Sequence, residues 1–286
     1  MTKVDQFESV FRSAIKDVFQ YRDICCQSVL VVSDLEPQMA KNFLADVQKF
    51  ATALDMHDVT GWKVLNGNDF TTTVDLLAII DSVKPDLLFT YRNLHSQAWR
   101  HPHSLGEHTD VMLNKTDVPV VVLPNPHAHT AHDHAMIDTN VVMALTDHLS
   151  NSHDLVNYAV RFTENDGLLM LVHIEDDNTF TRYMDVISKI ESIDTDEARE
   201  KIKHQLIKEP TEYIETVKSI LAEQKLPIEI HEIVTFGHRL KQIRDYIEQY
   251  KVDLLVMDTK DEDHSAIHGL AYPLAVELRQ IPLLLM

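Results

Sequence analysis

The stretch Ser28-Val-Leu-Val-Val-Ser-Asp34 is a short, continuous apolar run that ends in a carboxylate. The stretch Asn140-Val-Val-Met-Ala-Leu-Thr-Asp147 repeats this pattern in the second half of the chain. Runs of this kind are typical of parallel strands that are buried on both faces of a sheet. Around both stretches, apolar runs alternate with segments whose apolar residues recur at helical spacing. The alternation predicts an α/β fold made of two tandem, Rossmann-like, doubly wound parallel-sheet domains.

The two halves also match in register. Lys84-Pro-Asp-Leu-Leu-Phe and Lys251-Val-Asp-Leu-Leu-Val share a lysine, an aspartate and two leucines at the same offsets. Gly106 and Gly269 each stand thirteen residues before a proline that opens an apolar strand. Self-similarity at fixed offsets indicates an internal duplication.

The copies differ in length. Asp34 and Asp86 are 52 residues apart, whereas the matching Asp147 and Asp253 are 106 apart. We therefore expect about four strands in the shortened first domain and about five in the second. The predicted organisation is an N-terminal amphipathic helix (1–22), domain 1 (23–126), a His-rich linker (127–139) and domain 2 (140–286). Within domain 2, two helices are expected between residues 178 and 224, with a break near Pro210.

Composition limits the classes of function. The chain has 26 Lys and Arg against 45 Asp and Glu, a formal charge of −19, so a nucleic-acid partner is not expected. Apolar runs are shorter than the roughly 20 residues that cross a bilayer, and the acidic N-terminus does not resemble a signal peptide. The adjacent Cys25 and Cys26 fit a reducing compartment, with a vicinal dithiol for soft metals or redox sensing as the alternative. We expect a cytoplasmic protein without a membrane partner.

The strand ending in Asp, the later Asp-Leu-Leu-Val strand, and Gly followed after thirteen residues by Pro-Leu-Leu-Leu resemble the universal stress protein domain. Two copies resemble the tandem, UspE-like members of the UspA superfamily. The resemblance covers residues 27 to 286 and implies the universal stress protein fold, which is like that of the adenine nucleotide alpha hydrolases. It implies a role in the stress response through binding of a ligand or a protein.

The nucleotide-binding branch of that family carries Gly-x2-Gly-x9-Gly-[Ser/Thr] after its fourth strand. In domain 2 of this chain, Asp258 and Asp261 stand at the two loop glycines, and Leu270 replaces the hydroxyl residue. In domain 1, Tyr91 and Leu94 hold the glycine positions. Two like charges about 4 Å apart repel by about 4 kcal/mol at an effective dielectric constant of about 20. We expect that ATP does not bind in the family manner and that no cofactor is required.

What remains of the nucleotide pattern is Asp34 and Asp147, which match the adenine-contacting aspartate of the relatives, and Gly269 of the loop. These residues define a degenerate cofactor-binding pocket. An adenine-nucleotide sensor in domain 2 is therefore one alternative function. The other interpretation of both aspartates is that strand-end carboxylates cap the following helix.

Histidine is enriched in the linker, where His127, His129, His132 and His134 follow one another closely. Neutral imidazoles are ligands for zinc, nickel and copper, so a metal-binding module is a second alternative. The competing interpretations are a polar linker without an ion, and a response to pH through the 17 histidines of the chain.

The chain lacks His-x-Gly-His, Ser-Gly-Gly-x-Asp-Ser and Gly-x-Ser-x-Gly signatures, so no catalytic residue is predicted and no enzyme is expected. Both copies end in an apolar strand, Val120-Val-Val-Leu123 and Leu283-Leu-Leu-Met286. Because exposed strands of this kind need cover, we expect the two to pair as an intramolecular pseudo-dimer. A homodimer of the whole chain and an unidentified protein partner are further expectations.

Overall fold

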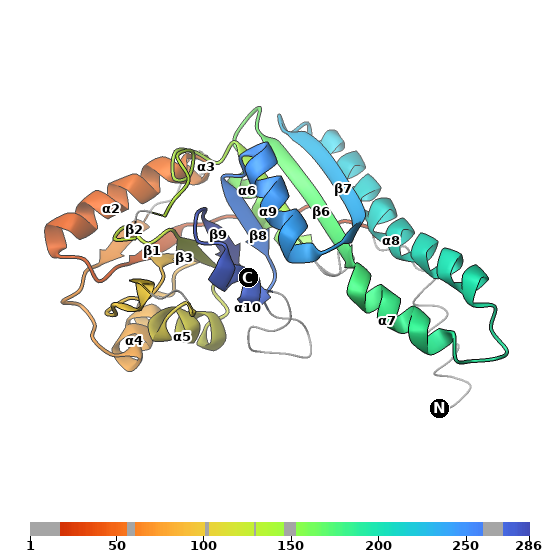
Figure 1. The fold of residues 1–286 in the computed structure, drawn as a ribbon. Coiled ribbons are helices and arrows are strands. Elements are labelled where there is room, and N and C mark those ends of the chain that lie inside the picture. The colour runs from red at the N-terminus through yellow and green to blue at the C-terminus, as the bar shows by residue number, and fades with distance from the viewer. Residues whose placement is uncertain (1–17, 56–60, 101–102, 129, 146–152, 260–270) are drawn as a thin grey trace, which may run out of the picture.

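A computed structural model describes residues 18–55, 61–100, 103–128, 130–145, 153–259 and 271–286. These residues form one mostly parallel sheet with helices on both sides (Figure 1). The first half of the chain contributes β1 (Ser28–Val32), α2 (Pro37–Phe50), α3 (Thr52–Asp55), β2 (Gly61–Leu65), α4 (Thr73–Val83), β3 (Leu87–Tyr91), the 3₁₀ turn η1 (Ala98–Arg100), α5 (Glu107–Lys115) and β4 (Val120–Leu123).

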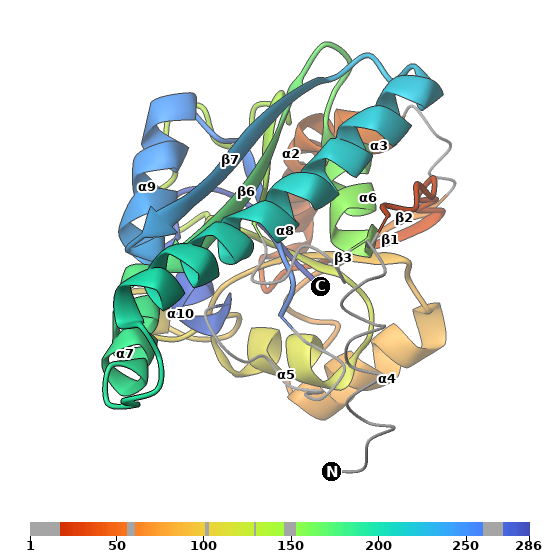
Figure 2. The same cartoon turned by 90° about the vertical axis from the view of Figure 1, so that its right-hand side faces the viewer.

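The second half repeats this alternation with longer elements. It contributes β5 (Val141–Leu145), α6 (His153–Phe162), β6 (Leu168–Asp176), α7 (Asp177–Ile187), α8 (Thr195–Gln224), β7 (Glu229–Gly237), α9 (Arg239–Tyr250), β8 (Leu254–Met257), α10 (Ala271–Glu277) and β9 (Leu283–Leu285). Helices α8 and α9 cover opposite faces of β6 and β7, and α7 with the first part of α8 extends beyond the strands (Figure 2).

In the described part of the chain the strand order is β2-β1-β3-β4-β9-β8-β5-β6-β7. The predicted α/β fold with doubly wound parallel strands is confirmed. Among the described residues, the first half supplies four strands of this sheet and the second half supplies five. Both halves nevertheless share one sheet, so the division into separate domains stays a prediction.

The halves meet where β4 and β9 pair, and this is the antiparallel contact in an otherwise parallel sheet. Val121 lies opposite Leu284 at the centre of the pairing, and both side chains are fully buried. The expected pairing of the two apolar end strands is confirmed. It covers two strand edges that would otherwise present unpaired backbone groups to solvent.

Two buried arginines cross between the halves. Arg92, just after β3, donates to the carbonyl oxygens of Ala275 and Leu278 at the end of α10. Arg161, near the end of α6, donates to the carbonyl oxygens of Ile24 and of two α3 residues. The last carbonyls of a helix have no partner within it, and a cation is favourable there. Burial lowers the pKa of Arg92 to about 9, so the guanidinium stays charged at neutral pH.

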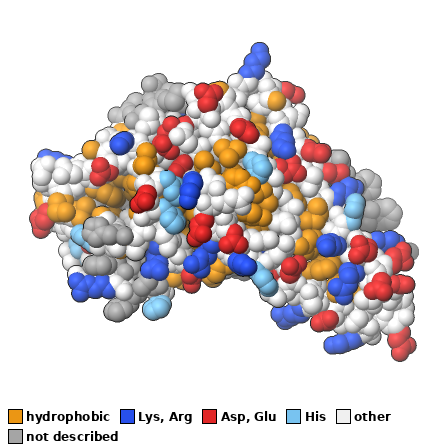
Figure 3. Space-filling view, turned by 45° about the horizontal axis from the view of Figure 1, so that its top comes forward, with side chains coloured by type: hydrophobic (Ala, Val, Ile, Leu, Met, Phe, Trp, Pro, Cys, Tyr) orange, Lys and Arg blue, Asp and Glu red, His pale blue; other side chains and the backbone are white. Residues whose placement is uncertain are grey.

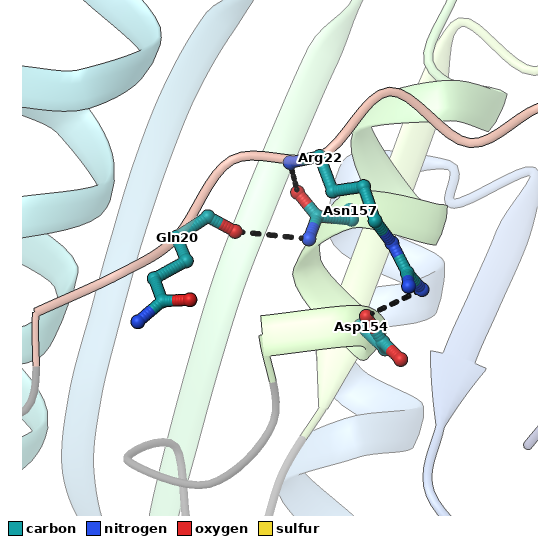
Figure 4. A network of polar contacts seen from close by, with 4 residues as sticks. All are labelled: Gln20, Arg22, Asp154 and Asn157. Atoms are coloured by element: carbon teal, nitrogen blue, oxygen red, sulfur yellow. Dashed lines mark hydrogen bonds and ion pairs between the residues drawn. The ribbon is translucent and has the colours of Figure 1, made fainter.

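The predicted N-terminal helix is wrong over residues 18–22, which are not helical, while residues 1–17 lie outside the described part of the chain. The reason is visible in Figure 4. The Asn157 side chain of α6 accepts the N–H of Arg22 (3.1 Å) and donates to the carbonyl of Gln20 (3.1 Å). The Arg22 side chain also bonds Asp154 at 2.8 Å. Backbone groups that a helix would use are bound to the second half instead.

The predicted helix break near Pro210 is also wrong. Pro210 is buried inside α8, and the chain breaks instead between α7 and α8, where Asp194 caps the start of α8. An interior proline costs a helix about 3 kcal/mol. Pro210 lies on the same side of α8 as Ile214 and Val217, and burial of this side against the sheet offsets that cost. No helix in the described residues is long and apolar enough to span a membrane.

The repeated Lys-x-Asp motif has one structural role in both halves. Each lysine ends its helix in the left-handed conformation, with φ of 50° and 56°. Asp86 then accepts the N–H of Ser28 (2.9 Å), and Asp253 accepts the N–H of Val141 (2.8 Å), at the starts of β1 and β5. The environments differ, because Asp86 is exposed and Asp253 is buried.

Replacing Arg161 with alanine should lower the free energy of unfolding by about 3 kcal/mol, because three buried carbonyl groups lose their donor. Urea denaturation at pH 7 measures this. Arg22→Ala is the matched control: its ion pair with Asp154 is more than half exposed, so a loss below about 1 kcal/mol is expected. Equal losses in the two variants would contradict the role given to Arg161.

Burial, with repulsion from the carboxylates of Asp138 and Glu164, raises the pKa of Asp253 to about 7. The native state therefore keeps a proton that the unfolded state releases near pH 4. The free energy of unfolding should fall by up to about 4 kcal/mol as pH rises from 4 to 7, and it should level off above pH 7. The substitution Asp253→Asn should remove this fall, so the variant protein should be more stable than wild type at pH 7.5.

Urea denaturation at several pH values compares wild type with Asp253→Asn. Asp86→Asn, at the equivalent exposed position, should keep the wild-type slope of stability against pH. An unchanged slope in Asp253→Asn would show that Asp253 is not the titrating group.

Candidate functional site

The carboxyl ends of β1 and β3 meet at the point where the strand order of the first half reverses. From β1 the chain passes to β2 on one side, and β3 then pairs on the other side. Ligands of doubly wound folds bind in the crevice at this switch point. Asp34, two residues beyond β1, lines a pocket of about 340 Å³ there with His95, Ser96, Gln97, Arg100 and His127. Of the predicted nucleotide-pocket residues, Asp34 thus lies in a pocket.

The Asp34 carboxylate is fixed by protein donors. The Tyr91 hydroxyl, at the end of β3, donates to Asp34 Oδ1, and the His95 N–H donates to Asp34 Oδ2 at 2.7 Å. The Asp34 N–H in turn donates to the Tyr91 hydroxyl at 3.2 Å. Tyr91 is fully buried and packs edge-on against Phe43 of α2, with ring centroids 5.3 Å apart. Asp34 and Tyr91 thus link the ends of β1 and β3 across the switch point.

The state of the Tyr91 hydroxyl follows from its surroundings. Burial, and then its hydrogen bond to Asp34 and the charge of that carboxylate, raise the pKa of Tyr91 well above its usual range. The hydroxyl therefore stays protonated and remains a donor at every physiological pH. A ligand that donates to the same Asp34 oxygen has to share this oxygen with the Tyr91 hydroxyl.

The wall of the pocket is a loop with an unusual backbone. Asn93 and His95 both have positive φ, 62° and 53°. Residues other than glycine adopt such values infrequently, and they concentrate at functional sites. Gly106 (φ 93°) supports this turn, because a Cβ there would lie 2.7 Å from the Asn93 Cα. The Phe70 ring packs edge-on against the His95 ring at 4.8 Å between centroids.

Tyr91 and Leu94 occupy the positions where the nucleotide-binding pattern has glycine, and both are buried. Their side chains fill space that bare backbone leaves open in a glycine loop. The pocket has instead one arginine and two histidines beside a single carboxylate. Such a set of side chains can bind a small polar or anionic ligand, and Arg100 can form bidentate hydrogen bonds to a carboxylate or phosphate.

The linker histidines occupy two different places. His127 lies at the pocket, where its N–H donates to Asn125 Oδ1 at 2.8 Å. His132 and His134 lie on the second half with their rings stacked 5.3 Å apart, and His134 Nε2 is 3.1 Å from the carbonyl oxygen of Val252. His129 lies outside the described residues.

No group of three or more His, Cys, Asp or Glu in the described part of the chain is arranged to hold a metal ion. The four-histidine site therefore stays a prediction. Asp147 and Gly269, the predicted nucleotide residues of the second half, also lie outside the described residues, as do the acidic residues 261–263. Just before the undescribed residues, the Thr259 N–H donates to the carbonyl of Met286 at 2.7 Å.

The sequence predicts only part of this pocket. Its patterns indicate Asp34 and His127 as candidate residues, but not that His95, Ser96, Gln97 and Arg100 share a pocket with Asp34 and His127. The glycine pattern of nucleotide-binding loops does not detect this loop, because the loop has other residues at those positions. The signal available in sequence was the concentration of polar residues directly after a buried strand, at the edge where parallel strands end.

No protein-family model and no curated protein matches the sequence. Its structure is similar to that of a universal stress protein from Archaeoglobus fulgidus, at 11% identity over 90% of this chain and 95% of that chain, with a TM-score of 0.48. It is also similar to a putative universal stress protein from Pseudomonas aeruginosa, at 11% identity over 91% of this chain and 93% of that chain, with a TM-score of 0.48. For the universal stress protein UspA from Lactobacillus plantarum, the identity is 15% over 51% of this chain and 97% of that chain, with a TM-score of 0.31.

These solved structures are universal stress proteins by description. Identities this low carry neither a ligand nor an activity from them to this chain.

Replacing Tyr91 with phenylalanine keeps the buried ring and removes the donor to Asp34. Because hydrogen bonds to charged groups contribute about 1.5 to 3 kcal/mol, the free energy of unfolding should fall by about 2 kcal/mol, as measured by urea denaturation at pH 7. Tyr183→Phe on α7 is the control, since Tyr183 is 64% exposed and its stability change should stay within about 0.5 kcal/mol. If Tyr91→Phe left the free energy of unfolding unchanged, the hydrogen bond from Tyr91 to Asp34 would not stabilise the fold.

Proposed function

We propose that this chain is a tandem universal stress protein that acts in the stress response by binding a ligand or a protein, and that it is not an enzyme. The duplicated halves support this, because each has a buried strand that an aspartate follows in the sequence. The resemblance of sequence pattern in both copies supports it as well. A binding role does not require the catalytic signatures that the sequence lacks.

The observation that carries the proposal is the link between Tyr91 and Asp34. In the nucleotide-binding pattern, an aspartate at this position contacts adenine and a glycine stands where Tyr91 is. Here the tyrosine fills the space and uses one acceptor position of the aspartate. The first half is therefore proposed not to bind ATP in the family manner.

Competition with this link has an approximate cost. If a ligand must displace a hydrogen bond to a charged acceptor worth about 1.5 to 3 kcal/mol, its affinity falls by about 10- to 150-fold. In the second half, the sequence places carboxylates where a triphosphate would lie. Both effects act against ATP.

The pocket itself favours a smaller ligand. Its volume of about 340 Å³ is at the lower end of the range for small-molecule sites. Arg100, His95 and His127 offer positive or donor groups, while Asp34 accepts hydrogen bonds. A compact ligand with an anionic group and a donor fits this chemistry better than a nucleoside triphosphate does.

Isothermal titration calorimetry of the full chain with Mg-ATP, at pH 7.5 and 150 mM salt, tests the proposal. The dissociation constant should exceed about 1 mM, corresponding to less than about 4 kcal/mol of binding free energy. A micromolar constant would overturn the claim that the family's ATP binding has been lost.

Two variants show which half of the chain holds any nucleotide that binds. Loss in Asp34→Ala would place the nucleotide in the first half and contradict the role of the Tyr91 link. Loss only in Asp147→Ala would place it in the second half, which is the alternative function of an adenine-nucleotide sensor. The same titration with AMP in place of Mg-ATP distinguishes recognition of adenosine from recognition of the triphosphate.

A further inference from the structure

Strand β7 forms one border of the sheet. It pairs with β6 and stands last in the strand order of the described residues. Seen from this side of the molecule, β7 lies between α9 and α8, and neither helix crosses it (Figure 2). Its side chains from Ile230 to Phe236 are all half-buried. The outer edge of β7 is therefore a border to which the described part of the chain adds no further strand.

Every second residue of β7 presents its backbone groups to this border. The Glu229 N–H donates to the carbonyl of Gly167, just before β6, at 2.8 Å. Because the backbone groups of successive strand residues point to opposite sides, the outward residues are Ile230, Glu232, Val234 and Phe236. The Phe236 carbonyl agrees with this, since it accepts Gln242 Nε2 of α9 at 3.3 Å. Within the described ranges, no hydrogen bond reaches the outward backbone groups of the other three.

The two borders of the sheet differ in their protection against pairing. Strand β2, at the other border, has five residues with the exposed Lys63 at its centre. Strand β7 has nine residues, contains neither lysine nor proline, and keeps an unbroken register with β6. Natural edge strands discourage pairing by shortness, lysine, proline or a bulge. Because β7 has none of these features, its border is suited to accept another strand.

The sequence of β7 complements itself in the antiparallel direction when Ile233 lies opposite Ile233 of a second copy. Ile230 then lies opposite Phe236. Glu232 lies opposite Val234, so all outward residues pair and form about eight backbone hydrogen bonds between the copies. A shift of two residues in one direction places Glu232 opposite Glu232 of the copy, which is repulsive, and the opposite shift leaves Ile230 unpaired. One register thus combines the most hydrogen bonds with no pair of like charges.

The charges near this border do not oppose a second copy. The ammonium group of Lys218 on α8 bonds the Glu232 carboxylate and offsets its charge. Acidic and basic side chains intermingle at the α7–α8 end of the molecule (Figure 3). Although the whole chain has a formal charge of −19, a copy that approaches β7 therefore does not meet a surface of one sign.

We propose that two copies of this chain pair through their β7 strands, antiparallel and with Ile233 on the two-fold axis. The two nine-stranded sheets then continue into each other. This contact differs from the pairing of β4 with β9, which lies in the interior of each sheet. It gives the expected homodimer of the whole chain a defined surface. Because one strand from each copy makes most of the contact, the interface is small, and we expect a dissociation constant in the micromolar range.

Sedimentation velocity of the full chain, from about 1 to about 200 µM at pH 7.5 and 150 mM salt, tests the proposal. The mass should rise with concentration from 32.8 kDa to twice this value. Val234→Pro should weaken the dimer at least about tenfold, because the outward N–H that it removes serves two symmetric bonds between the copies and none to β6. Val64→Pro is the matched control, since Gly61 donates to Gln27 and Val64 is therefore an outward residue of β2. It should leave the dimer unchanged.

A disulfide between the copies tests the register. In a chain with Cys25→Ser, which removes the exposed thiol, Ile233→Cys should form a cross-linked dimer on incubation with oxidised glutathione. The two Cα atoms would lie about 4.5 Å apart in a non-hydrogen-bonded pair, a separation that a disulfide accepts. Thr235→Cys is the control, because the two copies of residue 235 would lie about 14 Å apart along the strands. A non-reducing gel measures both.

Each other outcome contradicts the proposal. A monomer at about 200 µM would show that the β7 edges do not pair. A dimer that Val234→Pro leaves intact, or that Val64→Pro weakens equally, would place the contact elsewhere. Equal cross-linking of the two cysteine variants, or none in either, would contradict the register. Circular dichroism and urea denaturation report whether Val234→Pro disturbs folding, and the cross-linking decides the question if it does.

Discussion

The antiparallel pairing of β4 with β9 is the constraint on which the rest of this structure depends. Each half ends in an apolar strand that is buried on both faces, so neither half can leave that edge open to solvent. Pairing the two edges makes one sheet and fixes the halves to each other. The antiparallel direction then decides which helices of the first half face which helices of the second, and the buried contacts across the junction follow from it.

Arg92 and Arg161 show how these contacts solve a problem that the pairing creates. Helices α3 and α10 end at the junction, where water cannot reach their last carbonyl groups easily. Each arginine comes from the opposite half and donates to those carbonyls. A guanidinium suits this role because its several donors lie in a fixed plane. The two halves therefore satisfy each other's backbone, and separating them would break these hydrogen bonds.

Much of this arrangement could be predicted from sequence, because it depends on local patterns. Continuous apolar runs predict the strands, and Lys84 and Lys251 with the aspartates that follow them indicate the duplication. The apolar strand at the end of each half predicts the pairing of β4 with β9. What could not be predicted depends on contacts between residues far apart in the chain. Pro210 stays helical because tertiary burial outweighs its propensity, and residues 18–22 are not helical because Asn157 binds their backbone. The pocket loop needs positive φ at Asn93 and His95, which no propensity predicts.

The Tyr91 link shows how one buried side chain ties the pocket to the fold. A glycine at this position leaves the strand-end aspartate available, whereas a buried tyrosine makes it part of the connection between β1 and β3. The same carboxylate then stabilises the fold, while the other side chains that line the pocket are exposed. His95 and Arg100 are exposed residues of this kind, on a loop held by Gly106 and by the bond from His95 to Asp34. A ligand that approaches the pocket therefore meets the side chains of this loop first.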